Sequence, residues 1–92
     1  MEMHQLRYFI AVAEEENFTR AAEKCFVPQP SLSAQIIKLE SELGAKLFNR
    51  LGRRVELTSA GTFFEKRARS ILMEAENAQR EISEGEGEPR GR

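Results

Sequence analysis

The 92-residue sequence contains a single cysteine, Cys25, and a single histidine, His4. One thiol cannot form a disulfide within the chain, and one imidazole without a second ligand at suitable spacing does not predict a metal site. No apolar run approaches the roughly 20 residues of a membrane-spanning helix. The start, MEMHQLRYF, lacks the basic and long apolar regions of a secretory signal. We therefore expect a cytoplasmic chain with no membrane partner, no metal and no cofactor.

The motifs of common enzyme classes are also missing. There is no GxxxxGK phosphate loop, no GxSxG nucleophile elbow, and no Ser, His and Asp set that a core of this size could organise. The length suffices for one small domain. Cys25 lies on the apolar face of a predicted helix, where simple burial explains it better than redox chemistry does. We do not expect an enzyme.

The formal net charge of −1 hides an uneven distribution. Residues 45–70 contain seven Lys and Arg against two Glu, a local net charge of +5, whereas acidic groups gather at residues 14–16 and 74–88. The middle of the chain could therefore face a negatively charged partner.

Apolar residues recur at helical spacing in three successive segments before residue 44. Asn17 is a good N-cap for a second helix over residues 18–25, and Gly44 is a good C-cap for a third helix that begins near Pro30. The link between the second and third helices is only about four residues, which predicts the steep crossing of a helix-turn-helix. The predicted core positions are Leu6, Phe9, Ile10, Ala13, Phe18, Ala21, Ala22, Cys25, Leu32, Ile36, Leu39 and Leu43.

After Gly44 the period of the pattern changes from helical to two, at Leu47 and Asn49 and then at Val55 and Leu57, with a turn signal at residues 51–53. This pattern predicts a small β-hairpin. Thr58 or Ser59 then caps a last helix that runs to about residue 82.

The last helix carries a heptad-spaced apolar seam. Its members are Phe64, Ala68, Ile71, Ala75, Ala78 and Ile82, and the neighbouring Leu72 is also a predicted dimerisation residue. The seam could pack on the preceding head, but it is longer than so small a head can cover, so we predict a homodimer through this helix. The resulting divisions are a head at 1–58, a linker and dimerisation helix at 59–82 and a disordered tail at 83–92.

The solvent side of the third helix is rich in short or amide-bearing side chains, which suit the reading of base edges in a major groove. They are Gln29, Ser31, Ser33, Ala34, Gln35 and Lys38. A helix that enters with its N-terminus first also directs amides at phosphates. Arg50, Arg53 and Arg54 in the hairpin could reach the DNA backbone or minor groove, and Thr19 could contact a phosphate. Each feature alone is typical of a solvated surface, but in this order they predict binding to double-stranded DNA. A protein-interaction module that uses the heptad helix, without nucleic acid, is the alternative.

The pattern "LE..LG..LF.R" followed by "LT.AG" resembles the N-terminal domain of the LysR-type transcriptional regulators, and the resemblance covers residues 3–82. The matching residues are Leu6, Phe9, Ala13, Phe18, Thr19, Ala21, Ala22, Gln29, Pro30, Leu32, Ser33, Gln35, Ile36, Leu39, Glu40, Leu43, Gly44, Leu47, Phe48, Arg50, Leu57, Thr58, Ala60 and Gly61. It implies a mainly α fold, a winged helix-turn-helix of three helices and a β-hairpin wing, followed by a long linker helix that dimerises antiparallel.

The same resemblance implies sequence-specific binding to an inverted-repeat promoter site and control of transcription. Small-molecule or redox sensing would belong to a C-terminal domain absent here, and full-length relatives usually form tetramers. Gln29, Pro30, Ser31, Ser33 and Gln35 would lie in the major groove and Arg53 in the minor groove. In the family, position 28 usually carries a Ser or Thr that caps the third helix or contacts a phosphate, and Pro28 can do neither. Position 34 often carries a longer polar residue, where this chain has Ala34. The segment "AAEKC", which ends with Cys25, resembles the corresponding segment in the peroxide-sensing branch of the family.

Overall fold

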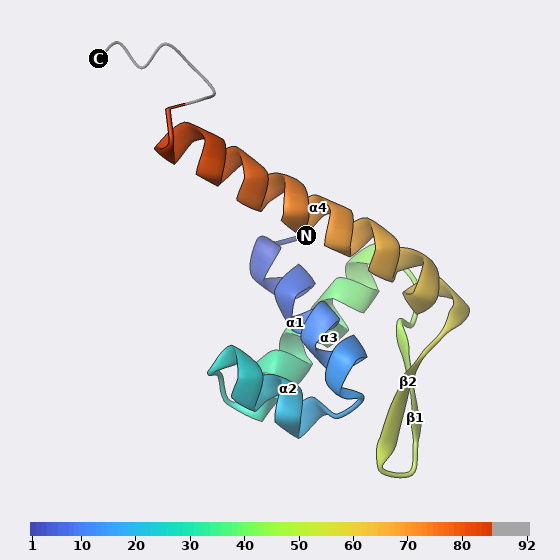
Figure 1. Ribbon diagram of the computed structural model, residues 1–92. Helices are drawn as coiled ribbons and strands as arrows, with labels where there is room; N and C mark the ends of the chain where they lie inside the picture. The colour runs from blue at the N-terminus through green and yellow to red at the C-terminus, as the bar shows by residue number, and fades with distance from the viewer. Residues whose placement is uncertain (86–92) are drawn as a thin grey trace.

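The computed structural model describes residues 1–85. In chain order the elements are α1 (Met3–Glu15), α2 (Phe18–Cys25), α3 (Gln29–Leu43), β1 (Phe48–Leu51), β2 (Arg54–Leu57) and α4 (Ser59–Ser83). Helices α1, α2 and α3 form a head, α4 crosses one side of the head and continues past it, and the hairpin projects beside the head (Figure 1). No helix in the described part is long and apolar enough to cross a membrane. The predicted disorder falls largely on residues 86–92, outside the described part.

Local capping determines where the helices of the head begin and end. Asn17 Oδ1 accepts a hydrogen bond from the backbone N–H of Arg20 at 2.7 Å, which confirms the predicted N-cap of α2. Helix α3 begins at Gln29, slightly earlier than predicted, and Pro28 occupies its N-cap without a side-chain hydrogen bond. Pro30 is then the second helical residue, where no backbone N–H is needed. Gly44 ends α3 with a positive φ of 71°.

The core forms where the three helices of the head meet the base of the hairpin and the start of α4. Phe9 is fully buried, with ring centroids 5.2 Å from Phe48 and 5.1 Å from Phe64, so one aromatic ring joins α1, β1 and α4. Most predicted core positions are buried or packed against this cluster. Leu43 is an exception with 40% exposure, because the last turn of α3 extends beyond the elements that cover the helix.

The hairpin is antiparallel, with Phe48 opposite Leu57 and Leu51 opposite Arg54. Leu47, which precedes β1, and Phe48 are both buried, whereas the rest of β1 is exposed. The predicted alternation of Leu47 and Asn49 is therefore wrong for this strand. In β2 the alternation holds, with Val55 buried in the core and Arg54 and Glu56 exposed.

Two polar residues fix the hairpin and α4 relative to α3. Glu40 Oε2 accepts hydrogen bonds from the N–H groups of Leu47 at 2.8 Å and Phe48 at 3.4 Å. Thr58 Oγ1 donates to the Lys46 carbonyl at 2.6 Å and accepts from the N–H of Gly61 at 2.9 Å. These contacts explain physically why Glu and Thr occur at those positions of the sequence pattern.

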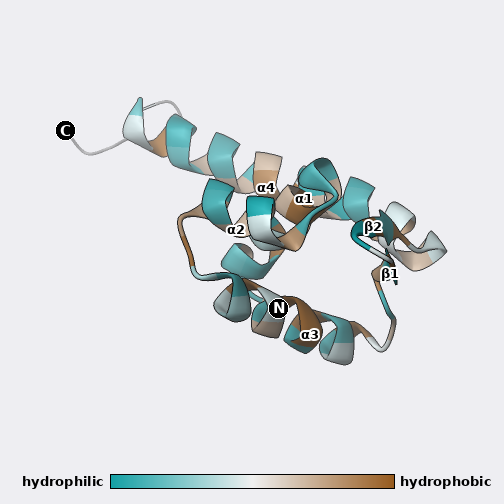
Figure 2. Cartoon of the chain, turned by 90° about the horizontal axis from the view of Figure 1, so that it is seen from below, coloured by the Kyte–Doolittle hydropathy of each residue, from teal (hydrophilic) through white to brown (hydrophobic). Residues whose placement is uncertain are grey.

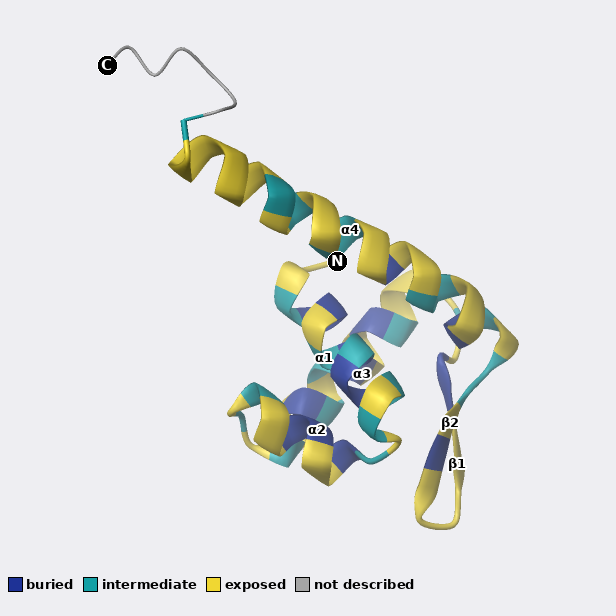
Figure 3. Ribbon diagram, viewed as in Figure 1, coloured by how far each residue is buried: buried dark blue, intermediate teal, exposed yellow. Residues whose placement is uncertain are grey.

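Helix α4 divides into a packed half and a projecting half. Ala68 is fully buried, and Phe64, Ile71 and Leu72 pack against the core. Ile82, near the far end, is 50% exposed, and most of the second half of the helix is exposed (Figure 3). The core of the head therefore continues across residue 58, and the first part of the predicted seam is used within the chain. Ala68 has no surface left for a second chain in this packing.

Candidate nucleic-acid interface

The exposed side of α3 lies on the side of the molecule away from α4 (Figure 2). Leu32, Ile36 and Leu39 anchor the helix in the core. Of the predicted contact residues on α3, Pro30, Ser31, Ala34 and Lys38 are exposed, and Gln29, Ser33 and Gln35 are half-buried. Gln29 and Ser33 face the hairpin, whereas Gln35 lies on the other flank of α3 and contacts Gln5 of α1.

A groove of about 240 Å³ separates the beginnings of α2 and α3 from the hairpin. Five residues predicted as DNA contacts line it together with the hairpin glycine and neighbouring residues. The complete lining is Asn17, Phe18, Thr19, Gln29, Arg50, Gly52, Arg53, Arg54 and Val55. Residues from α2, α3, β1 and β2, far apart in sequence, therefore converge beside the N-terminus of α3.

A second groove, of about 380 Å³, lies between α3 and β1. Ser33 and Arg50 line it, and so do Lys46 and Asn49, which were not predicted as contacts. Lys46 belongs to the basic segment 45–70, and this local excess of positive charge could have indicated it as a contact. The position of β1 alongside α3 is known only from the tertiary structure, so no local sequence pattern indicated Asn49 as a contact.

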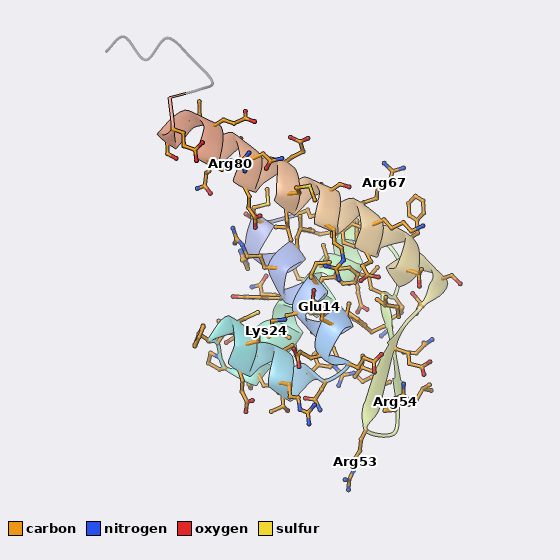
Figure 4. The ribbon with its side chains drawn as sticks, viewed as in Figure 1. Glu14, Lys24, Arg53, Arg54, Arg67 and Arg80 are labelled. Atoms are coloured by element: carbon orange, nitrogen blue, oxygen red, sulfur yellow. The ribbon has the colours of Figure 1, made fainter. Side chains whose placement is uncertain are left out.

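The three hairpin arginines have different surroundings. Arg50 places its guanidinium carbon 4.1 Å from the ring centroid of Phe18. Arg54 lies 3.7 Å from carboxylate oxygens of both Glu16 and Glu56. Arg53 forms no ion pair within residues 1–85 and extends away from the tip of the hairpin (Figure 4). The charge of Arg53 is therefore the least compensated of the three.

Two glutamines of α3 already have hydrogen-bond partners within the protein. Gln29 Nε2 donates to Ser33 Oγ at 2.6 Å, and Gln35 Oε1 accepts from Gln5 Nε2 at 3.0 Å. The oxygen of the Gln35 amide is therefore engaged within the protein.

A charged cluster joins three helices on another side of the head. Glu14 lies 2.7 Å from Lys24 and 3.1 Å from Arg69 (Figure 4 labels the first pair). The hydrogen bond from Lys24, joined by that from Arg69, holds the pKa of the Glu14 carboxyl below its usual value against a smaller opposing effect of burial. Burial raises the pKa of the half-buried Cys25 thiol, which favours its less reactive protonated form. Within residues 1–85, no three His, Cys, Asp or Glu side chains are grouped so that they could hold a metal ion.

A helix-turn-helix of α2 and α3 beside a two-stranded wing defines the winged helix-turn-helix class, as the sequence predicted. Residues 3–62 match the family of bacterial regulatory helix-turn-helix proteins known as the lysR family, and the chain belongs to that family. The chain is 55% identical over 78 residues to the Hca operon transcriptional activator HcaR of Escherichia coli (strain K12). That match covers 85% of this chain and 26% of HcaR, so the chain spans about a quarter of the length of this relative.

Two solved structures with bound DNA have the same fold. The crystal structure of the CbnR_DBD–DNA complex has a TM-score of 0.87 and 42% identity, covering 92% of this chain and 98% of that one. The BenM_DBD complex with benA site 1 DNA has a TM-score of 0.86 and 43% identity, covering 91% and 98% of the two chains.

Proposed function

We propose that this chain binds double-stranded DNA sequence-specifically as a homodimer and is the DNA-binding part of a LysR-type transcriptional regulator. The observation that carries the proposal is the accessible face of α3 beside a hairpin whose Arg53 has no acidic partner in the described residues. A helix of this width fits a major groove, and a guanidinium beside it suits phosphates or the minor groove. The DNA-bound structures of CbnR_DBD and BenM_DBD support the assignment by similarity.

In this proposal, Thr19, Arg50, Arg53 and Arg54 serve mainly the DNA backbone or minor groove. The residues of the proposed major-groove contact are Gln29, Pro30, Ser31, Ser33, Ala34, Gln35 and Lys38. The dimer forms through the projecting half of α4, with Ala75, Ala78 and Ile82 as its contacts. Effector sensing and tetramer formation belong to a further domain, and the whole protein acts in the cytoplasm without catalysis.

Selection of the 92-residue chain against random DNA duplexes, read by sequencing, tests the proposal. Enrichment of an inverted repeat, with half-sites about one helical turn apart, is expected for a two-fold symmetric dimer. Failure to enrich any sequence at low salt, where phosphate contacts are strongest, would contradict DNA binding. The heptad helix would then support the second candidate, a module that binds only protein.

A further inference from the structure

Gln5 is the one polar side chain that is buried within residues 1–85, with 1% exposure. It lies in the first turn of α1, and no part of the proposed function so far uses it. Its Oε1 accepts a hydrogen bond from the backbone N–H of Glu2 at 2.8 Å, and its Nε2 donates to Gln35 Oε1 at 3.0 Å. A buried amide thus connects the backbone of α1 to a side chain of α3.

The direction of this chain of hydrogen bonds is determined by its first member. A backbone N–H can only donate, so the Gln5 group that faces Glu2 is its oxygen. The NH₂ group of Gln5 then faces Gln35 and can only donate, so Gln35 must turn its oxygen toward Gln5. The Gln35 NH₂ group, at the other corner of the planar amide, has no hydrogen-bond partner within residues 1–85.

We propose that Gln5 is a positioning residue that makes Gln35 a hydrogen-bond donor toward DNA. This inference rests on the proposed function. A freely rotating glutamine can donate and accept, and so can pair with both groups of an adenine edge. A glutamine whose oxygen is already engaged favours acceptors: N7 or O6 of guanine, N7 of adenine, O4 of thymine, or a phosphate oxygen.

Gln5→Glu is the informative variant. A carboxylate at position 5 can still accept from the N–H of Glu2, and glutamate is a preferred residue at this place in the first turn of a helix. Because a carboxylate cannot donate, Gln35 has to reverse its amide and turn its oxygen outward. The same substitution therefore retains the helix cap and inverts the group that Gln35 presents.

The experiment repeats the duplex selection at about pH 8 with the wild-type chain, Gln5→Glu, Gln35→Ala and the control Asn77→Asp, which adds the same charge to α4 on the side away from Ala75 and Ile82. We expect the wild type to prefer guanine or thymine, which present acceptors, at one half-site position, and Gln5→Glu to shift that preference by roughly tenfold toward cytosine, which presents a donor. Gln35→Ala should abolish the preference at that position alone. Base reading by Gln35 is overturned if Gln5→Glu keeps the wild-type base preferences, or if it loses affinity equally for all sequences. If Gln35→Ala also loses affinity equally for all sequences, the contact of Gln35 is with a phosphate oxygen.

A measurement without DNA separates this inference from the proposed function. Solvent exchange of side-chain amide hydrogens by NMR should be slow for Gln5 and fast for Gln35 in the wild type, and should become slow for Gln35 in Gln5→Glu. Slow exchange for Gln35 in the wild type would refute the orientation. If the wild-type chain enriches no duplex, the proposed function is overturned, and so is the role of Gln35 in reading a base. The exchange rates still decide how the Gln35 amide is oriented.

Discussion

The three arginines of the hairpin show how surroundings change what one residue type can contribute. A guanidinium held by carboxylates, as Arg54 is by Glu16 and Glu56, must give up those contacts to reach a phosphate. Arg53 has no such contact within the described residues and sits at the turn itself. Its binding to a phosphate displaces only water and counterions. The largest single contribution from the hairpin to DNA affinity is therefore expected at Arg53.

Replacing Arg53 with alanine should weaken binding to all duplexes by a similar factor. The slope of log affinity against log salt concentration should fall by about 1, since one phosphate contact is lost. Fluorescence anisotropy titrations at several salt concentrations measure both quantities. Arg67→Ala is the matched control, because Arg67 lies over Phe63 on α4 at 5.3 Å from the ring centroid. Equal losses in the two variants would mean that only total charge matters and that Arg53 makes no specific contact.

Gly61 is required by close approach between α4 and the residue before β1. A Cβ added there would collide with the carbonyl oxygen of Leu47, a backbone atom held by the N–H of Thr58 at 3.0 Å. Gly61→Ala should therefore lower the free energy of unfolding by about 1–3 kcal/mol, although alanine in an open helix site would raise it. Urea denaturation measures the change, with the exposed neighbour Thr62→Ala as the control. A more stable Gly61→Ala variant would show that α4 shifts freely.

At the scale of elements, the hairpin has little core of its own and depends on neighbouring elements for its position. Glu40 holds the backbone before and at the start of β1, and Thr58 holds the residue that leads into it. The guanidinium of Arg50 over Phe18 adds a contact between β1 and the start of α2. The wing is thus positioned by contacts at its base and by Arg50 further along β1, while residues 51–53 at its tip remain exposed.

The ion cluster of Glu14, Lys24 and Arg69 connects α1, α2 and α4, and it predicts a pH effect. The folded state lowers the pKa of Glu14, so the cluster stabilises the fold above the ordinary pKa of a glutamate, about 4. This contribution is lost as the pH falls below that value and the carboxyl becomes protonated. Because these side chains are 38% to 49% exposed, screening by solvent keeps the contribution small.

Glu14→Gln should accordingly be slightly less stable than the wild type at pH 7 and equal to it near pH 3. Thermal unfolding followed by circular dichroism at both pH values, at low and high salt, measures the difference. Glu23→Gln removes an exposed carboxylate of α2 that forms no ion pair in the described residues, and should have little effect at either pH. A loss in Glu14→Gln that persisted at pH 3 would point to packing instead of charge.

At the scale of the whole molecule, the second half of α4 is the clearest unpartnered feature. The molecule measures 56 by 25 by 19 Å, and α4 runs beyond the head (Figure 1). The packed half of this helix is used internally, so a substitution at Ile71 would disturb the head as well as any dimer. The dimer prediction is better tested further along the helix.

Ile82→Glu should convert the dimer to a monomer without lowering the melting temperature of the head, because Ile82 is half-exposed and lies past the core. Sedimentation velocity gives the oligomeric state. Met73→Glu is the control: Met73 is also apolar and 60% exposed, but it lies on the opposite side of the helix from the seam. Dissociation by Met73→Glu alone would mean that the dimer forms through another face of α4.

The sequence by itself determined the features that depend on near neighbours along the chain. Asn17 caps α2, Gly44 ends α3, and helical spacing identified the core sides of the first three helices, because a cap or an amphipathic face is specified within a few residues. The family could be recognised from the sequence because its matching residues keep a fixed spacing within short segments of the chain.

Tertiary structure alone decided which polar groups satisfy one another and where burial ends. Gln5 and Gln35 are 30 positions apart, and Arg54 meets Glu16 across the head, so no local pattern signals either pair. The same holds for the exposure of Leu43 and for the division of α4 into a packed and a projecting half. An amphipathic pattern says that a face will be covered, but the neighbour that covers it, and how far along the helix that neighbour reaches, depends on the packing of the whole chain.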